Sequence, residues 1–377
     1  SDDRRRNDTG MTARRILTRC LLRPADVQPQ FERFEVIGTF NPGAIEFDDS
    51  VVLLVRVAER PTETREGYVA LPRWDWQRGG VAIDWRRKDE VEPIDPRMVR
   101  IESSGQIRLT FLSWLLVAFS RDGFTIDSFG EEAFLPANRY EAFGVEDPRL
   151  TRIDDRFYFT YVSVSEHGVA TSLASTADFK SFERHGIIFC PENKDVMLFP
   201  EKIDSRYVAL HRPSMQAHFS IPEIWIARSP DLYHWGSHRR LLGAEVVWAT
   251  AKIGGGTPPI RTDRGWLTLF HGHARPDAGG GVGEYAAAAL LLDLDQPERV
   301  IGFSPQPVMV AEEEFERSGF LPDIVFPTGL VRREDHLLVF YGAADTATGV
   351  AQYSLKDLSG SAAPGSTARV STSGFPA

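Results

Sequence analysis

A strand phrase that recurs along the chain constrains the fold more than any other feature. Each copy has a proline-containing entry, a charged turn and a strand rich in β-branched and aromatic residues. The copies begin near Asn41, Asp95, Asp147, Phe199, Pro258 and Phe326, at spacings of roughly 50 to 70 residues. Such a repeat is more typical of a closed ring of β-sheets than of a sandwich, because each unit buries its apolar face only against its neighbours. The sequence therefore predicts an all-β propeller.

The segments that follow the first strand of each repeat predict further strands of the same sheet. They run through an apolar stretch into an acidic turn and an aromatic residue, as in the segments that begin at Trp114, Val169 and Ile224. Asp and Gly tolerate the tight backbone between antiparallel strands, so a four-stranded blade fits each repeat. Sustained helical periodicity is rare, and the best helix candidate is residues 310–317.

The number of blades and the ends of the domain follow less directly. A literal count gives six blades, or five if the copy at Asp95 elaborates the first one, and the residues alone leave both counts open. We expect a single propeller domain over residues 27–358. Residues 1–26 are expected to form a flexible N-terminal segment and residues 359–377 a disordered C-terminal tail, since few apolar side chains there offset the entropy of ordering.

Charge and cysteine content exclude several classes of function. The 377 residues include 43 Lys and Arg against 53 Asp and Glu, without a long basic stretch, which disfavours nucleic-acid binding. Phosphate binding then requires a local cluster of cations. Cys20 and Cys190 form neither a disulfide framework nor a metal-ligand spacing, which favours a reducing, cytoplasmic compartment. No apolar run reaches the length of about 18 residues that spans a bilayer. We expect no metal, no cofactor and no membrane, and the sequence leaves a homo-oligomer open.

Asp147 is the candidate proton donor. It lies in the segment Phe-Gly-Val-Glu-Asp-Pro-Arg, after a glycine that permits close backbone approach and before a proline that restricts the turn. A carboxyl at a repeat entry can point into the central channel, where propellers place function. The alternative is a turn device, since Asp95-Pro96-Arg97 repeats the same tripeptide.

Four basic side chains occupy matching places on two successive repeats. Lys194 lies before one strand and Arg212 after it, while Lys252 and His271 hold the same two places on the next repeat. Lys and Arg supply charge-assisted donors and His a further bond, so the set suits a tetrahedral oxyanion. Taken singly, each is more often a solvated or salt-bridged residue, and the pairing across repeats is what favours an anion site.

Polar residues at the first and last repeats complete the candidate site. Asn41, Arg56 and Asp345 fall at entry or exit positions, where they either hold sugar hydroxyls or form a hydrogen-bonded seam that closes the ring. The glycines at residues 254–256 lack the spacing of a nucleotide-binding loop and are expected to let the backbone approach a ligand or a neighbouring blade.

The phrases FNPGA, GVEDPR, NKDVMLFPEK, LHRP, GGGTPP, LFHGH and YGAADT together resemble glycoside hydrolase family 130, the β-mannoside phosphorylases and related mannosidases. The resemblance implies a five-bladed propeller. It also implies that Asp147 is the catalytic acid, that the basic set binds phosphate, although some members have Arg at the place of Lys194, and that Asn41, Arg56 and Asp345 hold the mannose. The wider match is most similar to the branch that acts on β-1,2-mannobiose and short β-1,2-mannans.

These expectations describe an inverting phosphorylase that forms α-mannose 1-phosphate, with inorganic phosphate as co-substrate. Such an enzyme needs no catalytic base, because phosphate is already anionic, whereas an inverting hydrolase needs a second carboxylate. The alternatives are a β-mannosidase with Glu146 or Glu201 as base, a β-1,4-mannosyl phosphorylase, and a non-catalytic carbohydrate-binding propeller. The loops that select the leaving sugar are expected within residues 60–86 and 138–142, the former containing Trp74, Trp76 and Trp85.

Overall fold

The computed structural model of the protein describes residues 13–214, 221–274 and 284–362. These ranges are almost wholly β-structure, as predicted, with two short helices, α1 (Glu314–Arg317) and α2 (Leu355–Ser361). α1 falls at the end of the predicted helical segment, whereas α2 was not predicted. Three single turns of 3-10 helix are η1 (Pro24–Asp26), η2 (Lys88–Glu90) and η3 (Arg139–Glu141). No helix in these ranges has the length and apolar character needed to cross a membrane.

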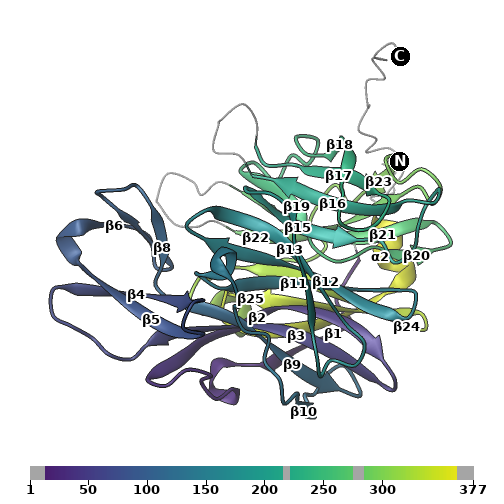
Figure 1. Ribbon diagram of the computed structural model, residues 1–377. Coiled ribbons are helices and arrows are strands. Elements are labelled where there is room, and N and C mark those ends of the chain that lie inside the picture. The colour runs from purple at the N-terminus through teal and green to yellow at the C-terminus, as the bar shows by residue number, and fades with distance from the viewer. Residues whose placement is uncertain (1–12, 215–220, 275–283, 363–377) are drawn as a thin grey trace, which may run out of the picture.

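Five antiparallel sheets form the body of the molecule (Figure 1). The first contains β2 (Phe34–Phe47), β3 (Ser50–Pro61), β9 (Leu112–Ser120) and β10 (Ser128–Phe129). The second contains β11 (Val145–Ile153), β12 (Arg156–Ser165), β13 (Gly168–Thr176) and β14 (Glu183–Phe189). The third contains β15 (Asn193–Leu198), β16 (Tyr207–Pro213), β17 (Ile224–Ser229) and β18 (Gly236–Leu242). The fourth contains β19 (Lys252–Gly255), β21 (Gly265–His273), β22 (Tyr285–Leu292) and β23 (Val300–Phe303), with β20 (Ile260–Thr262) paired to β21.

The fifth sheet joins the two ends of the described chain. It contains β24 (Val325–Arg333), β25 (His336–Ala343) and β26 (Ala347–Ser354), and its outer strand is β1 (Leu17–Leu22), which pairs antiparallel with β26. The prediction of a flexible segment over residues 1–26 is therefore wrong for β1, because its backbone partners lie more than 300 residues away and local composition carries no sign of them. Residues 359–361 likewise belong to α2. Residues 1–12 and 363–377 lie outside the described part.

Apolar side chains fill the spaces between successive sheets. β3 packs on the second sheet through Val52 and Leu54, which meet Phe159, and on the fifth sheet through Leu53, which lies in one cluster with Phe340. Three further clusters lie between the second and third, third and fourth, and fourth and fifth sheets. Because alternate side chains of a strand point to opposite faces, a strand packed on both sides is apolar along its whole length.

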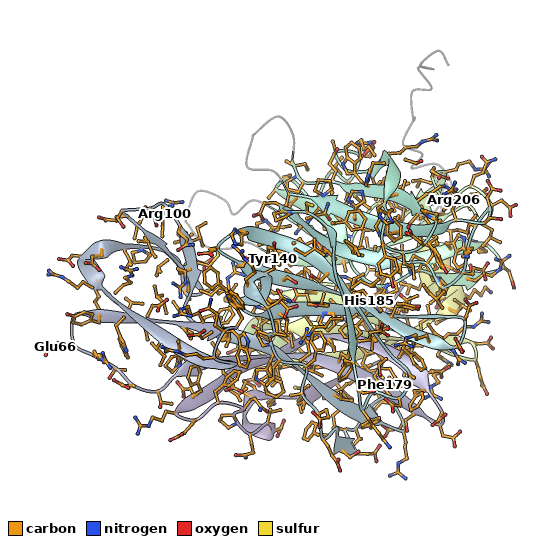
Figure 2. The ribbon with its side chains drawn as sticks, in the orientation of Figure 1. Glu66, Arg100, Tyr140, Phe179, His185 and Arg206 are labelled. Carbon is orange, nitrogen blue, oxygen red and sulfur yellow. The ribbon has the colours of Figure 1, made fainter. Side chains whose placement is uncertain are left out.

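A smaller β-structure is inserted between β3 and β9 of the first sheet. It consists of a hairpin of β4 (Tyr68–Asp75) and β5 (Gly80–Arg87), followed by a three-stranded sheet of β6 (Val91–Asp95), β7 (Met98–Ile101) and β8 (Ile107–Leu109). The insertion projects from the body at the left of Figure 1, and Glu66, before β4, lies near its outer end in Figure 2. The phrase copy at Asp95 lies in this inserted sheet, outside the five main sheets.

Candidate active site

An irregularity shared by three strands directs polar side chains toward one place. β2, β11 and β15 each lose their pairing register at the segment that contains Asn41, Asp147 and Asp195, respectively. The φ angles of these residues are 50°, 50° and 56°. Asn and Asp adopt this left-handed conformation more readily than most residues with a side chain, and a bulge turns the side chain it carries out of the regular alternation.

The eight residues that the sequence assigned to proton donation, phosphate binding and mannose binding line a single cavity of about 810 Å³. They come from all five main sheets, so the fold brings together side chains that are up to about 300 positions apart. The set is Asn41, Arg56, Asp147, Lys194, Arg212, Lys252, His271 and Asp345. Their individual roles remain predictions.

The carboxyl of Asp147 is held by two donors. Asn41 Nδ2 and Arg56 Nη1 each donate to Asp147 Oδ1 at 2.9 Å. Arg56 Nη2 also donates to Glu146 Oε1 at 2.8 Å, and Arg56 Nε donates to Ser113 Oγ at 3.1 Å. Within the described residues no hydrogen bond reaches Asp147 Oδ2, so this oxygen is the one left available to a ligand.

The neighbouring acid, Glu146, has a raised pKa. Burial and the adjacent Asp147 raise the pKa of Glu146, while Arg56 acts to lower it. The guanidinium of Arg56 lies 4.6 Å from the ring centre of Phe40. Its ion-pair partners are the carboxyls of Glu146 and Asp147. Arg56 and the two carboxyls therefore form one buried, ion-paired unit.

The two pairs of basic residues differ in their cross-strand register. Lys194 of β15 lies directly opposite Arg212 of β16. Lys252 of β19 pairs with His273 rather than with His271, which lies opposite Gly254. The matching positions read from the sequence were therefore two residues out on the second pair, although both side chains still line the cavity.

Asp195 is a central residue of the site that the sequence interpretation missed. Arg149 Nη2 donates to its Oδ1 at 3.1 Å, and Arg212 Nε lies 2.9 Å from its Oδ2, an ion pair by distance although the N–H is not aligned for a hydrogen bond. His271 Nε2 is 3.5 Å from the same oxygen. Burial alone would raise the pKa of Asp195, but the guanidinium groups of Arg212 and Arg149 hold it well below its usual range. Its place beside Lys194, at the position equivalent to Asp147, was the available signal.

Several polar atoms around Asp195 are buried without a hydrogen-bond partner among the described residues. Arg212 Nη1 and both ring nitrogens of His271 make no hydrogen bond to the described residues. Burial lowers the pKa of His271 well below its usual value, so the ring is neutral near pH 7. Burial, together with the charges of Arg212 and Lys194, lowers the pKa of Lys252 to about 7. Unpaired buried donors are costly, and a bound oxyanion would satisfy them.

The glycine run allows the close approach that the sequence predicted. A side chain at Gly254 would lie 2.5 Å from Asp195 Oδ2 and 2.7 Å from His271 Nε2. A side chain at Gly256 would lie 2.7 Å from the carbonyl oxygen of Leu269 and 3.0 Å from that of Pro327. These glycines therefore let β19 pass close to its neighbours.

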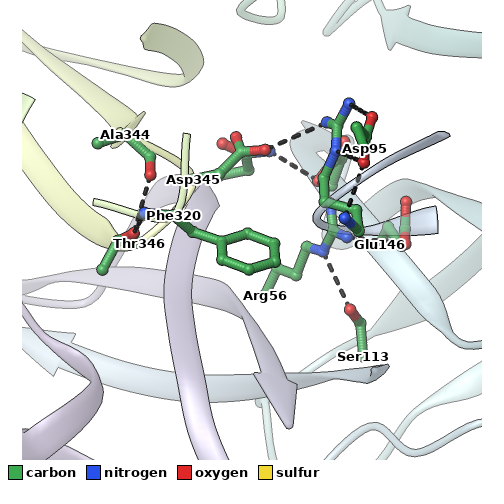
Figure 3. A network of polar contacts seen from close by, with 11 residues as sticks. Arg56, Asp95, Ser113, Glu146, Phe320, Ala344, Asp345 and Thr346 are labelled. Carbon is green, nitrogen blue, oxygen red and sulfur yellow. Dashed lines mark hydrogen bonds and ion pairs between the residues drawn. The ribbon is translucent and has the colours of Figure 1, made fainter. Parts of the chain in front are cut away.

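Asp345 lines the cavity from the turn between β25 and β26. Arg97 Nη1 donates to its Oδ2 at 3.3 Å, and Figure 3 shows Asp345 in one polar network with Asp95, Arg56 and Glu146. Burial raises the pKa of Asp345 against the lowering effect of Arg97 and Arg56.

The walls of the cavity differ from those expected for the leaving sugar. Neither residues 60–86 nor residues 138–142 line it; the walls come from the inserted sheet, through residues 104–107, and from the β12–β13 turn, through residues 164–169. The tryptophan-containing segment is a regular hairpin rather than an irregular loop. Glu201 lies outside the cavity, exposed and paired with Arg261.

Among the described residues, no group of three or more His, Cys, Asp or Glu side chains is arranged to hold a metal ion. Cys20 and Cys190 are free thiols. The expectations that no cofactor is needed and that the protein is cytoplasmic stay predictions.

Comparison with known proteins identifies the family. The model of glycoside hydrolase family 130, described as beta-1,4-mannooligosaccharide phosphorylase, matches residues 106–359. The chain belongs to this family. A beta-1,2-mannobiose phosphorylase from Listeria innocua is 42% identical over 335 residues, which cover 87% of this chain and 92% of that protein. A 1,2-beta-oligomannan phosphorylase from a Thermoanaerobacter species is 34% identical over 252 residues, 66% of this chain and 81% of that protein.

A solved structure extends the match to the fold. The Listeria innocua enzyme in complex with β-1,2-mannobiose aligns with a TM-score of 0.84 at 38% identity, covering 91% of this chain and 96% of that chain. The family resemblance read from the sequence is confirmed by these matches.

Proposed function

We propose that the protein catalyses the inverting phosphorolysis of β-mannosides, with β-1,2-mannobiose or short β-1,2-mannooligosaccharides as substrates and α-mannose 1-phosphate as product. The observation that carries the proposal is that four basic side chains line the same cavity as Asp147, whose Oδ2 accepts no hydrogen bond from the described residues. The family description names a β-1,4 linkage, whereas the two relatives described above are named for β-1,2-linked substrates. Their coverage of this chain supports the β-1,2 linkage.

The architecture that supports this site is a five-bladed propeller. Five main sheets, each with a four-stranded path, pack through apolar clusters between successive sheets, and one cluster joins the fifth sheet to the first. β1 completes the fifth sheet, so the two ends of the described chain close the ring together. The inserted sheet that contains Asp95 is an elaboration of the first blade.

Phosphate binds among the basic residues. Arg212 Nη1 and a ring nitrogen of His271 are buried in the cavity without a partner among the described residues, and Lys194 and Lys252 add charge. Asp195 does not cancel this field, because it is shared between Arg149 and Arg212 and serves to orient both guanidinium groups. Phosphate thereby satisfies donors that the protein leaves unpaired.

The reaction is a single displacement. A phosphate oxygen attacks the anomeric carbon as the bond to the leaving sugar breaks, and the departing oxygen takes a proton that originates on Asp147, directly or through a mannose hydroxyl. Asn41 and Arg56 orient Asp147 through Oδ1, which leaves Oδ2 to carry the proton. Asn41, Arg56 and Asp345 also hold the mannosyl unit, and Asp147 regains its proton before the next turnover.

A β-mannosidase is the second candidate, because Glu146 places another carboxyl in the cavity. Its Oε1 accepts a hydrogen bond from Arg56 Nη2, and the positive charge of Arg56 weakens Glu146 as a base for activating water. Incubation of β-1,2-mannobiose with and without phosphate separates the two functions. We expect α-mannose 1-phosphate only with phosphate present. Release of free mannose at the same rate without phosphate would establish hydrolysis instead.

A further inference from the structure

Arg97 is a charged residue of the cavity that the reaction described above leaves without a task. It lies between β6 and β7 of the inserted sheet, and it lines the cavity although the rest of that sheet belongs to a projection from the body. In the sequence, Asp95-Pro96-Arg97 favours a simple turn. The contacts of Arg97 show that this turn also reaches Asp345.

The guanidinium of Arg97 joins two carboxylates from different parts of the fold. Arg97 Nη2 donates to Asp95 Oδ2 at 2.9 Å, and the backbone N–H of Arg97 donates to Asp95 Oδ1 at 2.7 Å. Arg97 Nη1 donates to Oδ2 of Asp345, in the fifth sheet. Asp95 thus fixes the fork of Arg97 on one side and leaves one nitrogen for Asp345, and Figure 3 shows both carboxylates in the same network.

The backbone around Asp345 is held firmly, but its carboxylate is not. Ala344 and Asp345 have φ angles of 50° and 47°. Thr346 secures this turn, since its hydroxyl accepts from the N–H of Phe320 at 2.7 Å and donates to the carbonyl of Ala344 at 2.8 Å. Among the described residues, the only hydrogen bond to the Asp345 carboxylate comes from Arg97.

Arg97 also bears on the charge of Asp345. The charged or titratable groups that face this carboxyl are Arg97, Arg56, Asp147 and Tyr285. Burial raises the pKa of Asp345 and Asp147 adds to the rise, while Arg97 and Arg56 oppose it. Loss of Arg97 would therefore favour the protonated acid, which accepts sugar hydroxyls less strongly than the carboxylate.

We propose that Arg97 is a positioning residue of the reaction: it orients and charges Asp345 for the mannosyl unit and ties the inserted sheet to that end of the cavity. The same insertion supplies residues 104–107 to the cavity wall, so the contact between Arg97 and Asp345 couples this wall to the mannosyl site. The inference rests on the proposed function, in which Asp345 holds the mannose.

A double-mutant cycle tests whether Arg97 acts through Asp345. We expect Arg97→Met to lower kcat/KM for phosphorolysis on the order of 10- to 100-fold, the effect of one charge-assisted hydrogen bond. Arg97→Lys, which keeps the charge but not the fork, should lose less. In an Asp345→Asn background, Arg97→Met should change kcat/KM by less than about 3-fold. The matched control is Arg100→Met, because Arg100 is a half-exposed arginine of β7 paired with Glu92 (Figure 2) and should stay within about 2-fold of wild type.

The pH profile supplies a readout that a purely structural role would not move. Since Arg97 helps to keep Asp345 ionised, Arg97→Met should shift the acidic limb of kcat/KM to higher pH, and Arg97→Lys should shift it less. Effects of Arg97→Met and Asp345→Asn that simply multiply, or an acidic limb that stays in place, would overturn the proposal. If Arg97→Met lowers the melting temperature strongly, Arg97→Lys carries the same comparison.

Mannose binding, measured by calorimetry with the same variants, separates this inference from the function itself. If the wild type forms no α-mannose 1-phosphate but the cycle remains non-additive for mannose binding, the proposed reaction fails and the role of Arg97 stands. If the wild type is a phosphorylase and the variants are additive in both assays, only the role of Arg97 fails.

Discussion

Replacement of Asp147 by Asn is the most direct test of the proposed chemistry. The amide keeps an oxygen where Asn41 and Arg56 donate at 2.9 Å, so the local structure has a reason to persist. Arg56 also retains Glu146 at 2.8 Å. We therefore expect a loss of folding free energy of no more than about 1 to 2 kcal/mol, the difference between a charged and a neutral acceptor. The rate constant should fall by roughly 10²- to 10⁴-fold, the usual contribution of a general acid.

The leaving group distinguishes proton donation from positioning. An aryl β-mannoside with a nitrophenolate leaving group departs without a proton, so the Asp147→Asn variant should lose no more than roughly 10-fold on this substrate relative to wild type. Phosphorolysis is followed by the release of nitrophenolate and, for β-1,2-mannobiose, by the formation of α-mannose 1-phosphate. A melting curve of the variant checks that the fold is retained.

Two results would refute the reasoning. Near-normal turnover of β-1,2-mannobiose by Asp147→Asn would remove Asp147 from the mechanism. An equal loss on both substrates would mean that the carboxylate positions the sugar and does not supply the proton. Asp127→Asn is the matched control, because Asp127 is paired with Arg121 near the surface, outside the cavity, and its replacement should leave both activities unchanged.

The remaining predictions concern the anion site and its supports. The KM for phosphate should rise as pH increases above about 7, because only protonated Lys252 attracts the anion. Lys252→Arg should abolish that rise, and a wild-type KM independent of pH would contradict the argument. Phosphate at 100 times its Kd should stabilise the wild type by about 2.7 kcal/mol, and Arg212→Met should remove most of this increase in a melting assay; full protection of the variant would exclude Arg212 from the site. Asp195→Asn should cost about 3 to 5 kcal/mol in denaturant unfolding, because it breaks a buried ion pair, and a loss below about 1 kcal/mol would show that the pair is dispensable. Gly342→Ala should lower kcat/KM at least roughly tenfold, because the new carbon would lie 1.8 Å from Asn41 Oδ1; unchanged kinetics would show that Asn41 need not stay in place.

Much of the site was accessible from the sequence because its residues lie beside recurring strand phrases. Asp147, Lys194 and Arg212 were found from their places at strand entries and exits, and the cavity contains all of them. Asp195 was not predicted because an anion site was expected to consist of cations, and its neighbour Lys194 supplies the cation in this segment. Both adjacent residues line the cavity because the bulge in β15 interrupts the regular alternation of side chains, which the sequence pattern does not reveal.

Arg97 shows a second limit of prediction from local sequence. A repeated Asp-Pro-Arg tripeptide is equally compatible with a turn and with a site. The copy at Asp95 makes the turn between β6 and β7, whereas the copy at Asp147 lies at the bulge inside β11. What separates Arg97 from Arg149 is the partner across space: Asp345 for the first, and Asp195 for the second. Neither partner lies near its arginine in the chain, so local pattern alone does not reveal the contact.

The amino-acid sequence by itself determined the all-β character, the repeated sheets and the residue types gathered for an anion and a sugar, because strand periodicity and turn chemistry are local properties. Only the tertiary structure decided that β1 completes the last sheet, that the copy at Asp95 belongs to an insertion, and that Asp195 and Arg97 complete the cavity. These features depend on pairing between segments that are distant in the chain and on bulges that redirect single side chains. Both are fixed by packing among the five main sheets, which no single stretch of sequence contains.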